Sequence, residues 1–360
     1  MKVLFLNNYD MLSSYGAWQK GEYPAHHLWG AAHLKDFGVD TEILPFEKFP
    51  GANSYWRLQR LLKLDQLGMR GLDQQLRALA QGHYDLIYSA CQNHSFLLAR
   101  LRAWGILRTP VIAVIHHPIV PGSVEKVFFT GHDRLICLSE SVRQGLLTDY
   151  AFLDPGKVIK LDWGVDEAFY GDYREAGADI SDTVPVIVSA GKSNRDHDVL
   201  VNAANGLNCQ VRIYCSEDSR PKVSPLPSNV VLTTGAKRAN PATYRELVEV
   251  YKQAFAVAIP INKTNALAGL TSLMDALAVG RPVIMTRNPY IDIDIEALGI
   301  GIWCDIADAA GWRAALSRLL NNPAEAAQMG RKARKLADEK YNIVQFTSDL
   351  AAVFTSLPRA

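Results

Sequence analysis

The chain has 360 residues, which is enough for two domains of ordinary size. Its composition, 48% hydrophobic and 21% charged, is typical of a globular protein, and a formal net charge of +1 gives no overall field that would favour nucleic acid as a partner. No apolar run reaches the roughly 18–20 residues that cross a bilayer, and the N-terminus enters a strand directly. We therefore expect a cytoplasmic protein without a signal peptide, whose five cysteines are reduced and buried.

Alternating apolar strands and helices are expected through the first half of the chain. The strands are predicted at 3–6, 41–44, 85–90, 111–115, 135–138 and 158–161, and the helices at 25–37, 54–80, 95–104 and after a Ser139 cap. The first βαβ unit lacks GxGxxG, which disfavours NAD binding there. Its long loop, residues 7–24, carries Tyr15, Trp18 and Tyr23, and we expect this loop to bind an acceptor.

The segment 54–70 is rich in basic residues. They outnumber its single acid, Asp65, and are interleaved with leucines and a tryptophan. Such a segment could lie on an anionic membrane face, which would make the protein peripheral at the inner membrane. The alternative is a packed helix with a solvated basic side.

A histidine pair follows the strand at 111–115. His116 and His117 stand at the carboxyl end of this strand, and that end of a parallel strand lines the ligand crevice in doubly wound sheets. A single histidine there would more often be a structural hydrogen-bonding group, but the pair makes a candidate functional site.

A second β/α series follows a linker-like segment at 167–184. Its strands are predicted at 186–190, 210–214, 230–233, 256–260, 282–285 and 302–304, and its helices at 198–204, 244–253, 269–279, 308–320, 324–337 and 344–354. The two halves are thus similar in kind, each a Rossmann-like α/β sheet.

The segment after the strand at 186–190 could bind a diphosphate. Gly191 gives the backbone room, and Lys192 and Arg195 place two cations beside a helix N-terminus, where anions are stabilised. The alternative is surface charge on an ordinary turn.

The segment 256–286 reads as strand, loop, helix and strand. Gly269 and Thr271 open its helix, whose first turn leaves backbone N–H groups unpaired and carries partial positive charge. Asp275, one turn further in, could accept hydrogen bonds from a ribose diol. The segment could therefore hold a phosphate and a ribose, and the alternative is an ordinary βαβ crossover.

Taken in order, these segments resemble the retaining GT-B glycosyltransferases of family 4. The resemblance is carried by MKVLFLNN with its loop and helix, the strand ending in His116, DRLICLSESV, KVIKLDWGVDEAFY, SAGKSNRDHDVL, GLTSLMDALAVGRPVIMT, GIGIWCDIADAAGW and MGRKAR. DALAVGRPVI resembles the family's EAMACGxPVV, and WGVD resembles its NGVD. The correspondence covers most of the chain and is weak in residues 45–80.

The resemblance implies an α/β protein with the GT-B fold, in which two Rossmann-like domains face each other across a cleft. Residues 1–167 would form the acceptor-binding domain and residues 168–343 the nucleotide-sugar-binding domain, with the helix at 344–360 packed back onto the first. The implied activity is transfer of a sugar from a nucleotide diphosphate sugar, expected to be a UDP-sugar, to a hydroxyl acceptor with retention of anomeric configuration. Polysaccharide, glycolipid or small-glycoside synthesis would use this reaction, and no metal or other cofactor is expected.

The resemblance also assigns roles to residues. Lys192 and Arg195 match the basic pair that grips the diphosphate, and His116 matches the family's histidine near the donor sugar, with His117 as its rival. The residues expected to bind the nucleotide sugar are Gly191, Asn265, Gly269, Leu270, Thr271 and Asp275. Those expected to bind the acceptor are Tyr15, Trp18 and His117.

One departure from the family pattern concerns the transferred sugar. The first acid of the family's paired-acid motif should lie eight residues before Asp275, where this chain has Leu267. Its role could pass to Thr264, Asn265, backbone N–H groups near Gly269, or the later acids Asp292, Asp294 and Glu296. The departure leaves two alternatives to a transferase: a nucleotide-sugar-binding homologue without turnover, and a nucleotide-sugar epimerase.

Overall fold

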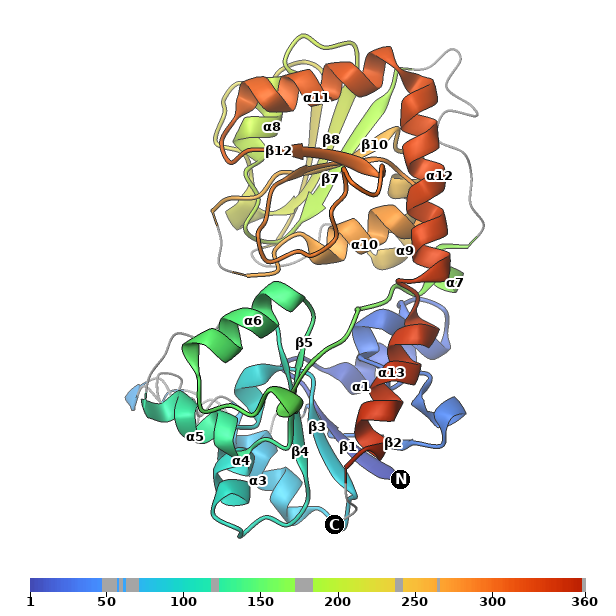
Figure 1. Ribbon diagram of the computed structural model, residues 1–360. Coiled ribbons are helices and arrows are strands. Elements are labelled where there is room, and N and C mark those ends of the chain that lie inside the picture. Colours follow the sequence, from blue (N-terminus) through green and yellow to red (C-terminus); the bar gives the residue numbers. More distant parts are fainter. Residues whose placement is uncertain are drawn as a thin grey trace. The chain divides into compact units, whose positions relative to one another are not determined.

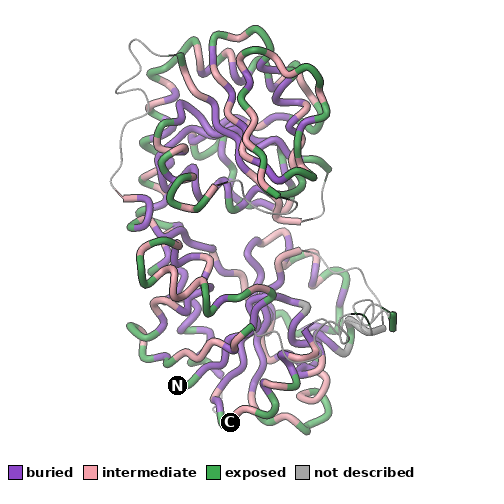
Figure 2. The backbone as a smooth tube through the Cα atoms, turned by 180° about the vertical axis from the view of Figure 1, so that it is seen from behind, coloured by how far each residue is buried: buried purple, intermediate pink, exposed green. Residues whose placement is uncertain are grey.

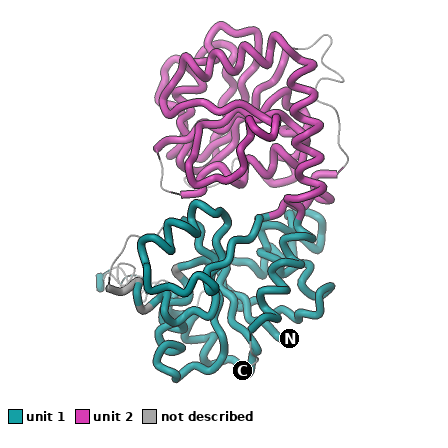
Figure 3. The backbone as a smooth tube through the Cα atoms, viewed as in Figure 1, with its two compact units in different colours: residues 1–163, 343–360 teal, residues 164–342 magenta. Residues whose placement is uncertain are grey.

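The computed structural model describes residues 1–46, 57, 61–62, 71–117, 123–171, 184–236, 242–263 and 266–357. The chain divides into two compact units (Figure 3): unit 1 comprises residues 1–163 and 343–360, and unit 2 comprises residues 164–342. The boundary that the sequence suggests, after residue 167, falls within a short helix of unit 2, α7 (Glu167–Tyr170).

Unit 1 is built on a six-stranded parallel sheet of order β2-β1-β3-β4-β5-β6 (Figure 1). Its strands are β1 (Lys2–Leu6), β2 (Asp40–Ile43), β3 (Leu86–Ser89), β4 (Val111–Ile115), β5 (Arg134–Cys137) and β6 (Val158–Lys160). Every residue of β3 and β4 is buried, so these strands do not alternate between apolar and polar residues. Such continuous burial is typical of a parallel sheet that is covered on both faces.

Helices and single turns connect the strands of unit 1. They are α1 (Met11–Gln19), α3 (Leu72–Ala80), α4 (Phe96–Ala103), α5 (Ser123–Gly131) and α6 (Glu140–Asp149), with 3-10 turns at Ala25–Leu28, Leu34–Phe37, Gln92–His94 and Pro155–Lys157. Ser139 caps α6 as predicted, because its side chain accepts a hydrogen bond from Val142 N.

Helix α13 (Ile343–Thr355) belongs to unit 1, although the segment before it belongs to unit 2. Phe346, Leu350 and Phe354 on its apolar face are buried, and the rings of Phe354 and Tyr88 lie 5.1 Å apart between centroids. The C-terminal helix therefore completes the core around β3.

Two predictions for the first half of the chain are wrong in detail. The expected loop at 7–24 contains helix α1, which Asp10 caps by accepting a hydrogen bond from Ser13 N at 3.0 Å. The expected helix at 25–37 is two separate 3-10 turns, because Trp29 and Gly30 between them adopt left-handed backbone conformations with φ of 53° and 93°. Of the helix expected at 54–80, the structure describes α3, and most of 54–70 lies outside the described residues.

Unit 2 is a second six-stranded parallel sheet, of order β12-β11-β10-β7-β8-β9. Its strands are β7 (Val186–Gly191), β8 (Gln210–Ser216), β9 (Val230–Gly235), β10 (Ala256–Ile259), β11 (Val283–Thr286) and β12 (Gly301–Cys304). Its other helices are α8 (His197–Ala204), α9 (Tyr244–Lys252), α10 (Leu270–Ala278), α11 (Ala309–Asn321) and α12 (Pro323–Glu339), with a 3-10 turn at Glu217–Ser219.

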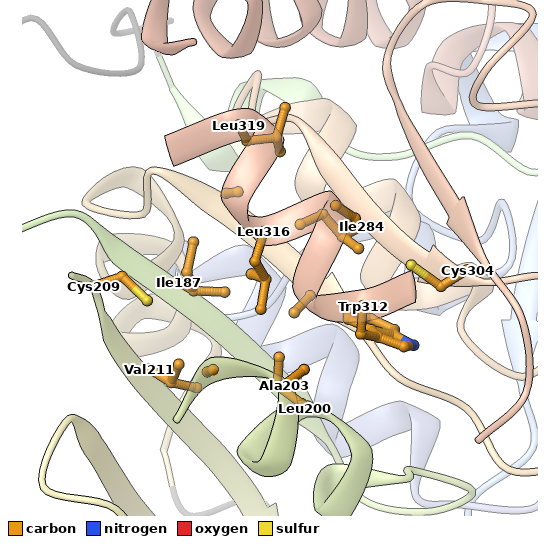
Figure 4. Packing of buried hydrophobic residues seen from close by; sticks show 14 of the residues in the cluster. Ile187, Leu200, Ala203, Cys209, Val211, Ile284, Cys304, Trp312, Leu316 and Leu319 are labelled. Carbon is orange, nitrogen blue, oxygen red and sulfur yellow. The ribbon is translucent and has the colours of Figure 1, made fainter. Parts of the chain in front are cut away.

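The core of unit 2 forms where α8 and α11 pack on the sheet. Trp312, Leu316 and Leu319 on one face of α11 are fully buried in a cluster with Ile187 of β7 and Leu200 of α8 (Figure 4). Strands β3 and β4 of unit 1 and β10 and β11 of unit 2 are buried along their whole length (Figure 2). This burial fixes the strand ends, from which the candidate site residues project.

Two further observations concern the whole of the described chain. All five cysteines are buried free thiols, as predicted. None of the described helices combines the length and the apolar character needed to cross a membrane.

Candidate functional site

The topology of unit 2 marks one point on its sheet where a ligand is expected. Strands β8 and β9 follow β7 on one side, and β10 returns to pair with the other side of β7. Ligands of such sheets bind outside the carboxyl ends of the strands, where the strand order reverses. The candidate site in unit 2 therefore comprises, among the described residues, 191–196 after β7 and 260–263 and 266–269 after β10.

Arg195 links the turn after β7 to helix α10. Its Nη2 donates a hydrogen bond to Ser272 Oγ at 2.9 Å, and Ser272 Oγ donates to Ala190 O at 3.1 Å. Asn262 holds the turn from the other segment, because its Nδ2 donates to Arg195 O at 3.0 Å. Burial lowers the pKa of Arg195, but a guanidinium stays charged at neutral pH. A positive charge is therefore fixed at the reversal point, and its buried Nε has no hydrogen-bond partner among the described residues.

Gly191 makes room for the Arg195 side chain. A Cβ atom on residue 191 would lie 2.5 Å from Arg195 Nε and 2.7 Å from its Cζ, closer than real Cβ atoms approach other atoms. The guanidinium therefore occupies space that any other residue at 191 would need.

We expect Gly191→Ala to displace Arg195 from Ser272 and to lower kcat/KM for sugar transfer about tenfold, which corresponds to about 1.4 kcal/mol. The measurement is steady-state release of nucleoside diphosphate. Gly145→Ala is the control, because a Cβ atom there has no neighbour within 4 Å. Equal kinetics in the two variants would contradict this role of Gly191.

Lys192 is exposed, and its backbone is fixed. Ser216 Oγ and Ser219 Oγ donate hydrogen bonds to Lys192 O at 2.8 and 2.6 Å. The Lys192 side chain is therefore anchored at a fixed point of the loop, and its ammonium group can reach an anion in solvent.

The start of α10 has the features of an anion site. Gly269 is its N-cap residue, with φ of 92°, and a Cβ atom there would lie 2.5 Å from Met285 Cε and 2.6 Å from Ile261 Cδ1. Within the described part of the chain no side chain caps this helix, and its first turn carries no acid. Leu270 is buried and Thr271 exposed in this first turn, whose N–H groups carry partial positive charge.

Asp275 lies inside a buried polar cluster on α10. Its Oδ1 accepts a hydrogen bond from Tyr170 Oη, and Tyr251, hydrogen-bonded to Ser272, lies near its charge. Burial raises the pKa of Asp275 to about 7, against the lowering effects of the Tyr170 hydrogen bond and the Arg195 charge. That Asp275 binds a ribose stays a prediction, and one of its carboxyl oxygens already has a protein donor.

Asn288 is a site residue that the sequence did not reveal. Its Nδ2 donates to Ala266 O and to Ala268 O, both at 3.0 Å, and its side chain is buried. It therefore shapes the backbone immediately before Gly269, around Leu267, the position at which the resemblance led us to expect an acid. An asparagine after a strand was the available signal, but nothing in its neighbourhood indicated which carbonyls it would meet.

Asn288→Ala is expected to lower the free energy of unfolding by about 1–3 kcal/mol, because two carbonyls lose their donor. It is also expected to raise KM for the donor, because residues 266–268 are no longer held. Urea denaturation and donor kinetics measure the two effects. Asn229→Ala is the matched control: Asn229 Nδ2 donates to three backbone carbonyls of the same unit, so its loss should cost stability without changing KM. A KM change of the same size in both variants would argue against a local role of Asn288.

Two of the three acids proposed as substitutes for the missing one, Asp294 and Glu296, have structural partners. Asp294 Oδ1 accepts hydrogen bonds from Glu296 N, Ala297 N and Trp303 Nε1, and these bonds lower the pKa of Asp294. Glu296 Oε1 accepts from Trp303 N at 3.1 Å. Both side chains thus stabilise the turn before β12. Thr264 and Asn265 lie outside the described residues.

Unit 1 has a pocket at its own reversal point, between β1 and β3. It encloses about 280 Å³ and is lined by residues that follow strands β1, β3 and β4 and by Trp29: Asn7, Asn8, Tyr9, Trp29, Ala90, Cys91, Gln92, His94, His116 and His117. Trp29, which sequence reasoning missed, packs edge-on against His116 with ring centroids 4.8 Å apart. Its left-handed backbone is unusual for a bulky residue and is a feature that clusters at binding sites.

His116 and His117 line the same pocket with different surroundings. His116 Nε2 lies 2.7 Å from Ala90 O, and burial lowers the pKa of this imidazole to about 4. His117 Nε2 lies 3.0 Å from Gln92 Nε2. His116 is therefore a neutral ring at physiological pH, and both histidines are placed to contact a ligand in this pocket.

Tyr15 and Trp18 lie on α1 and pair with each other, with ring centroids 5.2 Å apart. Trp18 also packs against His33 at 5.8 Å. Neither residue lines the described pocket, so the structure brings His117 to the pocket and does not bring these two aromatic residues with it. Their acceptor role stays a prediction.

Sequence comparison finds limited similarity to named proteins. No family model matches the chain. It is 27% identical over 221 residues to the D-inositol 3-phosphate glycosyltransferase of Corynebacterium urealyticum, which covers 58% of this chain and 51% of that protein. The chain spans about half the length of the curated relatives it matches.

Structure comparison covers nearly the whole chain. Sucrose-phosphate synthase from Thermosynechococcus elongatus matches with a TM-score of 0.69 and 14% identity, over 99% of this chain and 98% of that chain. The Anabaena protein HepE in complex with UDP matches with a TM-score of 0.62 and 13% identity, over 99% and 100%. Sequence identity this low is evidence for a shared fold and for nothing more specific. The predicted fold is confirmed: this chain has the GT-B fold, which it shares with these proteins, and it is similar in sequence to glycosyltransferases.

Proposed function

We propose that this protein is a retaining glycosyltransferase that moves a sugar from a nucleotide diphosphate sugar to a hydroxyl acceptor. The observation that carries the proposal is the fixed Arg195 guanidinium beside α10, at the reversal point of the unit 2 sheet. The exposed Lys192 and the start of α10, which no described side chain caps, add positive charge from the same two segments.

These groups suit the chemistry of a departing diphosphate. Breaking the bond between the anomeric carbon and the phosphate oxygen leaves negative charge on the diphosphate. Arg195, Lys192 and the first N–H groups of α10 would stabilise this charge more strongly in the transition state than in the bound donor. Gly191 and Gly269 contribute to this stabilisation, because their lack of a side chain leaves the space that the Arg195 guanidinium and the start of α10 occupy.

A UDP-sugar is the donor that we propose, bound by unit 2. HepE, which shares the fold, was crystallised with UDP and with UDP-glucose, and this supports uridine as the first nucleoside to test. We propose that the pocket of unit 1 receives the acceptor. Among its described lining residues there is no lysine or arginine, which favours an uncharged, hydroxyl-bearing part of the acceptor there.

Two further expectations belong to the proposal. Catalysis is expected to need no metal, so transfer should persist in the presence of a chelator. Contact with a membrane through residues 54–70 stays a prediction, because most of that segment lies outside the described residues.

The test mixes purified protein with UDP-, GDP- and ADP-sugars and a panel of polyol and sugar acceptors that includes D-inositol 3-phosphate. Acceptor-dependent release of nucleoside diphosphate, with the anomeric configuration kept in the NMR spectrum of the product, supports the proposal. Nucleotide binding without transfer across the panel would favour a homologue that has lost turnover. Isomerisation of the donor without acceptor would indicate an epimerase.

A further inference from the structure

Gln92 lies between the two histidines of the unit 1 pocket. It is 2% exposed and begins the 3-10 turn that follows β3. Its Oε1 accepts a hydrogen bond from His116 N at 2.8 Å, and its Nε2 lies 3.0 Å from His117 Nε2. One buried amide therefore contacts both members of the pair.

These contacts determine which nitrogen of His117 carries a proton. A backbone N–H can only donate, so the amide atom facing His116 N is the oxygen, and the atom facing His117 is the NH₂ group. An amide NH₂ can only donate, so His117 Nε2 accepts. The proton of His117 is therefore on Nδ1.

His116 has the opposite tautomer. A carbonyl oxygen can only accept, so the contact with Ala90 O requires a proton on His116 Nε2. The two adjacent imidazoles thus differ in the nitrogen that donates.

We propose that Gln92 is a positioning residue that holds His117 as the Nδ1–H tautomer, so that His117 serves the acceptor as a hydrogen-bond donor and not as a base. The role of Gln92 in sugar transfer rests on the proposed function, whereas the assigned tautomer of His117 does not. Protonation of His117 at Nε2 would put a donor against the NH₂ group of Gln92 and would break the contact. The glutamine therefore opposes proton uptake at that nitrogen.

The test is the ¹⁵N NMR spectrum of the histidine side chains in the full chain, near pH 8, above the ordinary pKa of histidine, about 6.5. His117 signals are assigned from a His117→Asn sample. In the wild type we expect Nε2 in the range of an unprotonated nitrogen and Nδ1 in the protonated range. A protonated Nε2 in the wild type would overturn the proposal by itself.

The Gln92→Glu variant is a second test. An ionised carboxylate can only accept hydrogen bonds, so it reverses the demand that residue 92 makes on His117 Nε2. His117 Nε2 is then expected to become protonated, so the two nitrogen signals exchange their ranges. Gln75→Glu is the matched control: it places a carboxylate at another buried glutamine of unit 1, whose Oε1 accepts from Leu97 N and Leu98 N, and should leave the His117 signals unchanged. Unchanged His117 signals in Gln92→Glu would also overturn the proposal.

Kinetics separate this inference from the proposed function. With an active donor and acceptor pair, Gln92→Glu is expected to raise KM for the acceptor about 3- to 10-fold, as for one lost or altered hydrogen bond, and to leave KM for the donor unchanged. If the tautomers are as stated but no sugar is transferred, the proposed function fails and the positioning of His117 stands.

Discussion

Arg195→Ala is expected to lower kcat for sugar transfer by on the order of 10²–10³, because a preorganised donor to the leaving charge is lost. The affinity for the donor should fall less, since the interaction strengthens as the bond to phosphate breaks. The measurement is the kinetics of nucleoside diphosphate release at saturating acceptor. Folding should persist, because Ser272 Oγ still donates to Ala190 O after the guanidinium is removed.

Arg220→Ala is the matched control for Arg195→Ala. Arg220 is an exposed arginine of the same unit, paired with Glu217 three residues earlier, and it lies outside the candidate site. Its replacement should leave kcat unchanged. Wild-type kcat in Arg195→Ala, or equal losses in the two variants, would refute the assignment of the diphosphate to this site.

Asp275→Asn is expected to stabilise the protein increasingly as pH rises. Burial raises the pKa of Asp275 from 3.8 in the unfolded chain to about 7 in the folded one, so the neutral acid is favoured by folding. Its favourable contribution is complete below the unfolded pKa and is lost as pH rises through the folded pKa. Between about pH 4 and pH 8 the wild type should therefore lose about 4 kcal/mol that the asparagine variant retains.

Urea denaturation over this pH range measures the difference between the two proteins. Tyr170→Phe provides an internal check, because the Tyr170 hydrogen bond lowers the pKa of Asp275. Without this hydrogen bond the pKa of Asp275 rises further. The Tyr170→Phe variant should therefore continue to lose stability at higher pH than the wild type does. Parallel stability curves for wild type and Asp275→Asn would contradict the shift. Ionisation of Asp275 opposes folding, so this acid lowers the stability of the protein at neutral and higher pH. Residues that cost stability in this way are common at functional sites, which supports a role for Asp275 in donor binding.

The strands and most helices were predictable because their signals are local. Uninterrupted aliphatic runs such as Val111–Ile115 identify buried parallel strands without reference to the rest of the chain. Helix α1 was missed because its sequence, MLSSYGAWQ, has the serines and glycine of a loop, although Asp10 before it is a normal cap signal. The break at Trp29 and Gly30 was hidden in a pattern that otherwise suits a helix.

The candidate site was predictable in its segments but not in its contacts. Gly191, Arg195 and Gly269 stand beside strand ends and helix starts, where residue type and position carry meaning. The bond from Arg195 to Ser272 spans 77 residues, that from Asn288 to Ala266 spans 22, and that from Gln92 to His116 spans 24. Such pairs depend on the order of strands in the folded sheet, and a single sequence does not encode that order in any local pattern.

The return of α13 to unit 1 has a consequence for biosynthesis. Residues 164–342 are contiguous, so unit 2 has all its strands once residue 342 leaves the ribosome. Unit 1 begins first but lacks Phe346, Leu350 and Phe354 until residues 343–357 emerge. The usual order, in which the N-terminal part of a nascent chain folds first, is therefore expected to be reversed here, with unit 2 the first to reach its native core.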